Sequence, residues 1–186
     1  MQSFLLATGL VTLAEIGDKT QLLAFLLAAR YRRPLPIILG ILVATLANHA
    51  LAAGLGTYLV TLFAPTTLGY VLALCFGLMA IWVLIPDKIS EDERPHSSRW
   101  GVFATALGVF FLAEMGDKTQ IATVALGARL PDYWSVVMGT TMGMMIANVP
   151  PVLASQKLLR KIPVRMVHIV AAALFAIMAV TALIHT

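Results

Sequence analysis

The chain has 186 residues, of which 60% are hydrophobic and only 12% charged, and its formal net charge is +4. Soluble domains carry about 25% charged residues, so this composition excludes an ordinary soluble enzyme and any separate soluble catalytic domain. The basic residues lie at the ends of apolar segments, where they orient membrane helices, and so they do not indicate nucleic-acid binding. The single cysteine, Cys75, excludes a disulfide framework. We therefore expect an integral membrane protein.

Six apolar segments follow one another along the chain, and each has the roughly 20 residues needed to cross a bilayer. Prolines and basic residues separate them, as at Pro34, Pro65 and Pro163. The first segment has neither a basic region before it nor a small-residue cleavage site, so we expect a helix of the mature protein and not a signal peptide. The sequence predicts an all-α polytopic protein with six transmembrane helices, at residues 3–28, 36–61, 67–86, 101–128, 134–156 and 164–184.

One eight-residue string occurs twice with a single change, as AEIGDKTQ at 14–21 and AEMGDKTQ at 113–120. The same shift of 99 positions aligns Gly40 with Gly139 and extends over three segments without a gap. We therefore expect two homologous three-helix repeats, at 1–86 and 100–186, joined by a polar linker at 87–99.

Because each repeat has an odd number of helices, the second repeat should cross the membrane in the opposite sense to the first. Inverted-topology repeats are typical of secondary transporters, whose substrate site lies near the bilayer midplane between the repeats. Short loops on the cytoplasmic side carry an excess of lysine and arginine. Only Arg129 falls on one side, and ten basic residues fall on the other: Arg30, Arg32, Arg33, Lys88, Arg94, Arg99, Lys157, Arg160, Lys161 and Arg165. Both termini should be outside, with the 87–99 linker in the cytoplasm.

The duplicated string places acidic residues inside apolar segments, where ionisable groups are costly and usually functional. Residues three apart share one face of a helix, so Glu15 and Asp18 are expected to point the same way. Gly17 weakens the helix, and a local kink there would expose carbonyl oxygens. The inverted symmetry predicts that four carboxylates surround one central cavity: Glu15, Asp18, Glu114 and Asp117.

The charge of the two motifs suggests what they bind. Four carboxylates and the ammonium groups of Lys19 and Lys118 leave a net charge of −2, which one divalent cation or two protons would balance. This balance suggests that a divalent cation is exchanged for protons. We expect the two lysines to balance charge through an ion pair with a motif acid, in preference to direct contact with the substrate.

The remaining side chains of the motifs offer oxygen ligands and no thiolate or imidazole. Such sites suit Mg²⁺, Ca²⁺ and Mn²⁺ better than Zn²⁺ or Cu⁺. The amides could equally form hydrogen bonds between helices. Additional ligands or supporting groups are expected at Thr20, Gln21, Thr119, Gln120, Asn48 and Asn148.

At its two motifs the chain resembles the GDT-type cation/proton exchanger family, which is marked by two copies of Glu-hydrophobic-Gly-Asp-Lys/Arg-Thr/Ser in six helices. EIGDKT at 15–20 and EMGDKT at 114–119 match in full. The resemblance implies a transporter of Mn²⁺ or Ca²⁺ with protons as counter-ion, and its small bacterial members resemble manganese exporters. It implies a bacterial inner-membrane location, and it assigns the acidic ligands to Glu15, Asp18, Glu114 and Asp117.

Other functions remain open at this point. An intramembrane aspartyl protease could use Asp18 and Asp117 as a dyad, although the glutamates and lysines beside them would disturb it. A helix scaffold, a channel, and a Ca²⁺-selective exchanger of the same fold are further alternatives. We expect no enzyme activity and no cofactor apart from the transported ions. Composition and motifs leave open the choice between Mn²⁺ and Ca²⁺, the proton stoichiometry, the role of the lysines, and whether the chain forms a homo-oligomer.

Overall fold

The computed structural model of the chain describes residues 1–85, 101–153 and 164–184. The predicted linker at 87–99 and six of the basic residues used for orientation (Lys88, Arg94, Arg99, Lys157, Arg160 and Lys161) lie outside these ranges. In the described part all regular secondary structure is helical, which confirms the all-α expectation. The helices are α1 (Gln2–Glu15), α2 (Lys19–Tyr31), α3 (Pro34–Leu62), α4 (Pro65–Trp82), α5 (Gly101–Glu114), α6 (Lys118–Arg129), α7 (Tyr133–Leu153) and α9 (Val164–Ile184).

Four of these helices, α3, α4, α7 and α9, are long and apolar enough to cross a membrane by length and composition. They correspond to the second, third, fifth and sixth predicted segments. Large apolar side chains are exposed along them, for example Leu74 at 65% and Ile177 at 58%. Extended apolar surfaces of this kind mark an interface with protein or membrane.

The first and fourth predicted segments differ from expectation. A continuous helix over 3–28 is wrong, because α1 ends at Glu15 and α2 begins at Lys19. A continuous helix over 101–128 is wrong in the same way, with α5 and α6 on either side of the second motif. The reason is local and lies in the motif itself, where a glycine with positive φ interrupts the helix.

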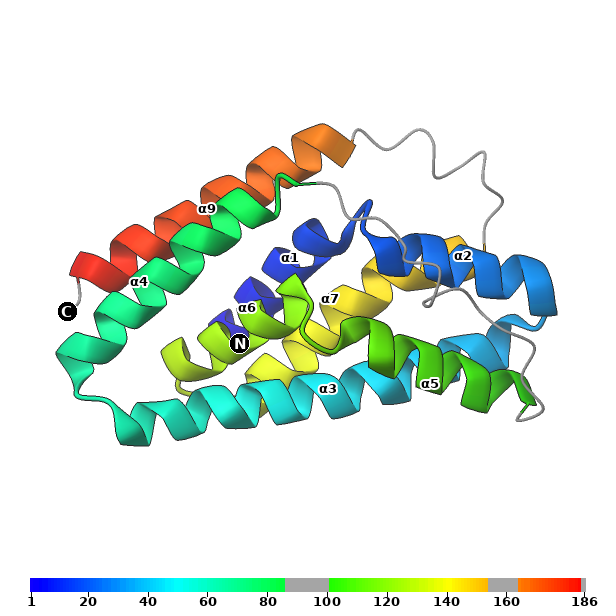
Figure 1. Cartoon of the computed structure of the whole chain (residues 1–186), viewed down its shortest axis with the longest axis horizontal. Helices are drawn as coiled ribbons and strands as arrows, with labels where there is room; N and C mark the ends of the chain where they lie inside the picture. Colours follow the sequence, from blue (N-terminus) through cyan, green and yellow to red (C-terminus); the bar gives the residue numbers. More distant parts are fainter. Residues whose placement is uncertain (86–100, 154–163, 185–186) are drawn as a thin grey trace.

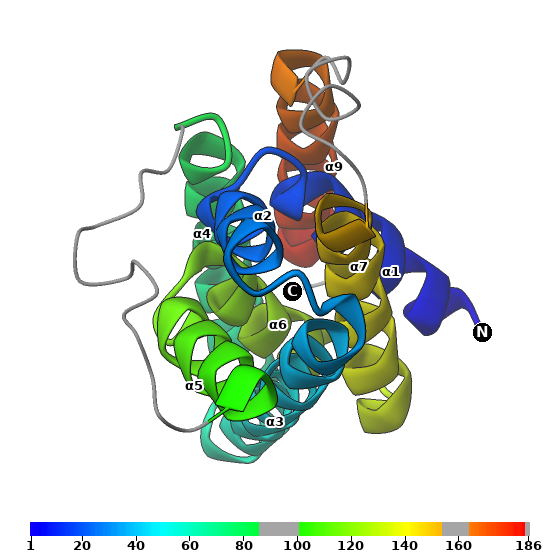
Figure 2. The ribbon, with the colours of Figure 1, turned by 90° about the vertical axis from the view of Figure 1, so that its right-hand side faces the viewer.

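The two halves of the chain interlock. The long helices α3 and α7 pack against each other, α1 packs along α7, and α5 packs along α3. Seen end-on in Figure 2, α5 lies beside α3 and α1 beside α7. The first helix of each half therefore packs mainly on the other half, so that the motif following α1 and the motif following α5 are brought into one region.

Two glycines allow these cross-half contacts. A Cβ at Gly40 of α3 would lie 2.9 Å from the carbonyl oxygen of Phe103 in α5, and a Cβ at Gly139 of α7 would lie 2.7 Å from that of Phe4 in α1. Gly40 and Gly139, like Phe4 and Phe103, are 99 positions apart. The same contact thus occurs twice, because small residues let helix backbones approach closely.

This packing predicts a clear difference between two glycines of α3. Gly40→Ala should lower stability by about 1–3 kcal/mol, because the added methyl meets backbone atoms that cannot move aside. Gly54→Ala should be neutral or stabilise the helix by up to about 1 kcal/mol, since alanine favours helix and the added Cβ would have only Tyr133 Cε2 at 3.9 Å. Thermal unfolding of the two variants in detergent tests this difference, and equal melting temperatures would contradict it.

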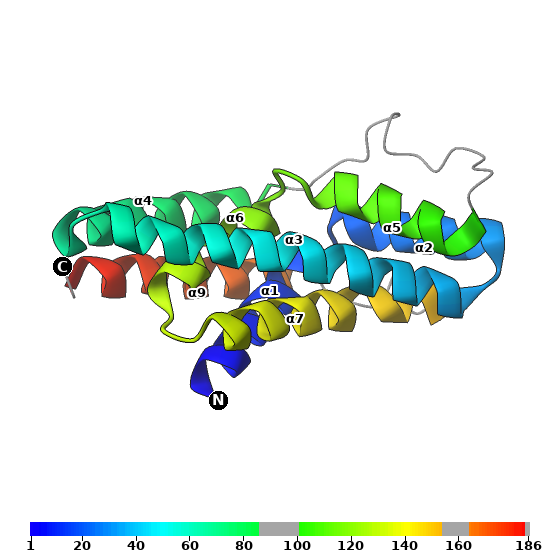
Figure 3. The same cartoon turned by 90° about the horizontal axis from the view of Figure 1, so that it is seen from below.

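The remaining pair of helices occupies one end of the bundle. In Figures 1 and 3, α4 and α9 lie side by side next to α1 and α6, while α2 and α5 lie at the opposite end. Among the described residues, α4 packs on α6 and α9 packs on α1, and neither makes more than sparse contacts with α2 or α5. The two helix breaks lie between these ends.

Candidate metal centre

Each motif forms a break between two short helices. Gly17 has a φ of +87° and Gly116 a φ of +76°, a region that glycine adopts without the Cβ penalty of other residues. The next residue, Asp18, is the N-cap of α2, and its side chain accepts a hydrogen bond of 2.8 Å from the backbone N–H of Lys19. Asp117 is the N-cap of α6. The glutamate therefore ends one helix and the aspartate begins the next.

The glutamines of the motifs hold the breaks in place. The Gly17 N–H donates to Gln21 Oε1 at 3.1 Å, and the Gly116 N–H donates to Gln120 Oε1 at 2.7 Å. Gln21 Nε2 also donates to the carbonyl oxygen of Ala147 in α7 at 3.0 Å. The two glycine bonds satisfy backbone N–H groups that the interruption of the helix leaves without helical partners. The Ala147 carbonyl lacks a helical partner for another reason, because the residue four positions later is Pro151, which has no N–H.

The prediction that Glu15 and Asp18 share one face of a continuous helix is therefore wrong, although the expected kink at Gly17 is present as a complete break. A signal for the break is in the sequence. A glycine at the position after the C-cap is typical of a helix end. An aspartate at the N-cap with a glutamine three residues later is typical of a helix start. Because apolar residues continue on both sides of the motif, a hydropathy profile shows one long segment and does not reveal this pattern.

Gln21→Met tests the supporting role of this side chain. The substitution removes both hydrogen bonds at nearly constant volume, and we expect it to lower the free energy of unfolding by about 1–3 kcal/mol. Gln2→Met, at the exposed start of α1, is the matched control and should stay within about 0.5 kcal/mol of wild type. Equal melting temperatures for the two variants would exclude the supporting role.

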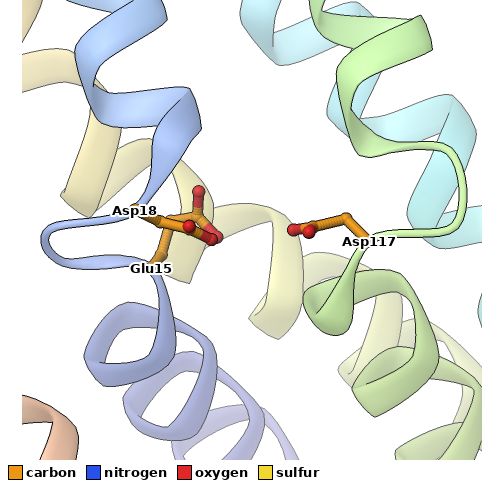
Figure 4. Close-up of side chains that lie close together, drawn as sticks. All are labelled: Glu15, Asp18 and Asp117. Atoms are coloured by element: carbon orange, nitrogen blue, oxygen red, sulfur yellow. The ribbon is translucent and has the colours of Figure 1, made fainter. Parts of the chain in front are cut away.

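Three carboxylates meet between the two breaks. Glu15 and Asp18 come from the first break and Asp117 faces them from the second (Figure 4). One oxygen from each lies within 4.8 Å of the others, and all three residues are buried. Oxygens bound to one Mg²⁺ or Ca²⁺ ion lie about 2.0–2.6 Å from it, and thus at most about 4–5 Å apart. The spacing is compatible with a single cation between them.

Glu114, the fourth predicted carboxylate, is fully buried but lies outside this group of three. Thr119 links it to the group, since the hydroxyl lies 3.2 Å from Glu114 Oε2 and 3.3 Å from Asp117 Oδ2. In the first break the Thr20 hydroxyl donates to Glu15 Oε1. Glu15 Oε2 and Glu114 Oε1 are buried without a hydrogen-bond partner among the described residues, and such acceptors are costly unless a proton or a cation satisfies them.

The motif lysines cross between the two breaks. Lys118 Nζ lies 3.2 Å from Asp18 Oδ1, and both side chains are fully buried. Lys19 Nζ lies 4.0 Å from Asp117 Oδ1, with 17% of the lysine side chain exposed. Each lysine thus pairs with the aspartate of the other motif, a contact that no spacing within one motif could reveal.

The two candidate asparagines make other contacts. Asn48 Nδ2 donates to the carbonyl oxygen of Phe111 at 3.0 Å and so joins α3 to α5. Asn148 Nδ2 donates to the Met144 carbonyl oxygen one turn earlier in α7, at 3.2 Å. Both residues are buried. The Asn48 bond corresponds to the helix-joining role that was left open for the asparagines, whereas the Asn148 bond lies within α7.

A contact that the sequence did not indicate covers the first break. His168 Nε2 of α9 lies 2.7 Å from the carbonyl oxygen of Ile16. A cavity of about 510 Å³ opens beside it, lined by Gly17, Leu84, Val164, Arg165, His168 and Ile169. The second break is not covered equally, since a Cβ at Gly116 would have no described atom within 4 Å. The structure is therefore asymmetric around the two motifs.

Buried acids at two interrupted helices within an apolar helical bundle are the arrangement of ion-coupled membrane transporters. Comparison with known protein families identifies the particular family within this class. Residues 3–91 and 102–186 match the family described as divalent cation/proton antiporter GDT1, and the chain belongs to this family.

Several curated proteins are similar over nearly the whole chain. A protein of Vibrio cholerae named "Putative manganese exporter" is 53% identical over 170 residues, which cover 91% of this chain and 84% of that protein. The GDT1-like protein sll0615 of Synechocystis is 29% identical over 92% of this chain and 91% of its own length. GDT1-like protein 5 of Arabidopsis thaliana is 26% identical over 99% of this chain and 96% of its own length. No solved structure matches the chain significantly.

The family assignment confirms the resemblance found at the two motifs. It supports cation transport across a membrane as the activity, and it places the chain among transporters and not among enzymes. The aspartyl protease alternative is set aside on this basis.

Proposed function

We propose that the protein exports Mn²⁺ in exchange for protons, and that Glu15, Asp18, Glu114 and Asp117 form its cation site. The observation that carries the proposal is the group of three buried carboxylates contributed by both motifs, with oxygens within 4.8 Å of one another. Glu114 belongs to the site through Thr119, which lies within hydrogen-bond distance of both acids of the second motif.

The surrounding chemistry supports a hard cation. The breaks offer carboxylate and hydroxyl oxygens, which are ligands for Mn²⁺, Ca²⁺ and Mg²⁺. The negative C-terminal ends of α1 and α5 lie at the breaks, as in transporters that bind cations at broken helices, while the positive N-terminal ends of α2 and α6 meet Asp18 and Asp117. The name of the Vibrio cholerae relative favours Mn²⁺ within this group.

We further infer six membrane crossings in two inverted repeats, 1–86 and 100–186, joined by a cytoplasmic linker at 87–99, with both termini outside a bacterial inner membrane. In this arrangement each broken pair, α1 with α2 and α5 with α6, forms one crossing. The repeated contact of Gly40 with Phe103 and of Gly139 with Phe4 supports the internal symmetry.

Alternating access follows from the same arrangement. In the proposed topology α1 and α6 form the outer half of the bundle, and α4 and α9 pack against them. The cavity beside Gly17 lies between Leu84, which precedes the linker, and Val164 at the start of α9. We infer that this cavity leads to the site from the cytoplasm, and that movement of α4 and α9 relative to the breaks opens the opposite path.

The decisive experiment is transport by the purified protein in liposomes. With an acidic lumen and a neutral exterior, an antiporter should take up Mn²⁺ while the lumen becomes more alkaline, and the two changes should have a constant ratio. Competition by Ca²⁺ and Mg²⁺ ranks the substrates, and a Ca²⁺-selective exchanger would be recognised by preferential Ca²⁺ uptake. Mn²⁺ uptake that is indifferent to the pH gradient would contradict proton exchange, and very fast uptake without proton movement would indicate a channel.

A further inference from the structure

We propose that Lys118 is an internal cation that replaces the transported metal as the partner of Asp18. The metal and the Lys118 ammonium group would then occupy the Asp18 carboxylate in turn. This inference rests on the proposed metal site and assigns one of its steps to a residue that is not itself a metal ligand.

The ion pair has the geometry that this role requires. Lys118 Nζ lies 3.2 Å from Asp18 Oδ1, and neither side chain is exposed. Lys118 is the first residue of α6, whereas Asp18 caps α2, so the pair connects the two motifs. An ammonium group buried without a counter-charge would be costly, and Asp18 supplies that charge.

The same carboxylate belongs to the three-acid group with Glu15 and Asp117. A metal ion bound there would sit close to Asp18, where its positive charge and that of the ammonium group repel each other. Lysine has a long flexible stem and a compact charge, so it can withdraw from the carboxylate without displacement of the helix. Metal binding and the Lys118–Asp18 pair are therefore competitive.

The reciprocal pair is weaker, because Lys19 Nζ lies 4.0 Å from Asp117 Oδ1 and the Lys19 side chain is partly exposed. The two lysines are equivalent in the sequence repeat but not in this structure. Lys118 is therefore the lysine that competes with the metal in this conformation, and Lys19 provides a matched comparison.

The competition has a consequence for transport. After the metal leaves, Lys118 neutralises Asp18, so that this carboxylate is not left as an unpaired charge in the membrane interior, and protons neutralise the other acids. Without Lys118 the metal should bind more tightly and leave more slowly. If Lys118 only supported the fold, its removal would weaken Mn²⁺ binding. The direction of the change in affinity therefore distinguishes a competing cation from a structural residue.

The test uses the full-length protein with Lys118→Met, the charge-preserving Lys118→Arg, and Lys19→Met. We expect Lys118→Met to bind Mn²⁺ about tenfold more tightly by titration calorimetry, the change produced by about 1.4 kcal/mol of lost repulsion. Net Mn²⁺ export should fall by a similar factor, while exchange of labelled for unlabelled Mn²⁺ at equilibrium continues. Lys118→Arg should bind within about threefold of wild type, since it keeps the charge, and Lys19→Met should change less than Lys118→Met.

Stability provides a second readout, because Lys118→Met leaves Asp18 buried without its lysine. The variant should melt at a lower temperature than wild type without metal, and saturating Mn²⁺ should restore most of the difference. Equal or weaker Mn²⁺ binding by Lys118→Met, or a variant that stays unfolded in saturating Mn²⁺, would overturn the role of Lys118. Failure of the wild-type protein to bind Mn²⁺ would instead refute the proposed function.

Discussion

Replacing Asp18 and Asp117 together by asparagine should abolish metal-dependent proton movement in liposomes. The double substitution removes two of the three clustered carboxylate charges while preserving side-chain size and the ability to cap α2 and α6. A contact to a charged group contributes about 1.5–3 kcal/mol and each 1.4 kcal/mol is tenfold, so we expect Mn²⁺ uptake to fall by roughly 100-fold or more. Uptake of Mn²⁺ under a pH gradient is the measurement.

Asp132→Asn is the matched control. Asp132 is an exposed aspartate just before α7, where its carboxylate accepts a hydrogen bond from the backbone N–H of Ser135 at 3.2 Å. Asparagine can also cap this helix start, so transport should remain near the wild-type rate. Full activity in the Asp18/Asp117 double variant would refute the proposed site. The corresponding pair Glu15→Gln and Glu114→Gln should likewise lose transport, whereas a purely structural scaffold would tolerate it.

Gly17→Ala should strongly destabilise the protein, for two separate reasons. An alanine at φ +87° costs about 1–2 kcal/mol in the left-handed region. Its Cβ would also lie 2.2 Å from Val164 Cγ1 at the start of α9. Valine in a helix strongly prefers one rotamer, so the overlap must be relieved by backbone movement, which adds about 1–3 kcal/mol. We expect a marked fall in melting temperature and in transport.

Gly116→Ala separates the cost of the backbone conformation from the cost of the overlap with Val164. It has the same backbone problem at φ +76°, but its added Cβ meets no described atom within 4 Å. Its loss of stability should therefore be limited to about 1–2 kcal/mol. Val164→Ala combined with Gly17→Ala should recover the part of the loss that comes from overlap, as a double-mutant cycle would reveal. Equal effects of Gly17→Ala and Gly116→Ala would contradict the asymmetry of the two breaks.

The sequence alone was sufficient to predict the class of protein, because a helix that crosses a bilayer needs an apolar segment of about 20 residues, and such segments are visible in the sequence. It also identified the acidic motifs, since ionisable residues inside apolar segments are costly and stand out. For the two motifs, however, the sequence predicted continuous helices with a local kink, and not two complete helix breaks. Apolar residues continue on both sides of Gly17 and Gly116, so hydropathy indicated one long helix where caps and positive φ angles produce two.

The separation of Glu114 from the other three carboxylates could not be read from the repeat. The two motifs are almost identical in sequence, and a repeat by itself predicts equal surroundings for Glu15 and Glu114. The surroundings of the two breaks differ as well, since α9 covers the first break through Val164 and His168, while Gly116 is left uncovered in the described residues. His168 has no counterpart in the first half, where the position 99 residues earlier is Gly69.

By itself, then, the sequence determined a helical membrane transporter with two acidic motifs and the residue types of an oxygen-rich cation site. It also predicted that the acids of the two motifs meet. Only the tertiary structure decided that Glu15, Asp18 and Asp117 form the close group without Glu114, and that Lys118 pairs with Asp18 across the motifs. Local spacing describes neighbours along a helix. The partner of a buried charge depends on which backbones pack together, and here the interlocking of the two halves brings together residues 100 positions apart.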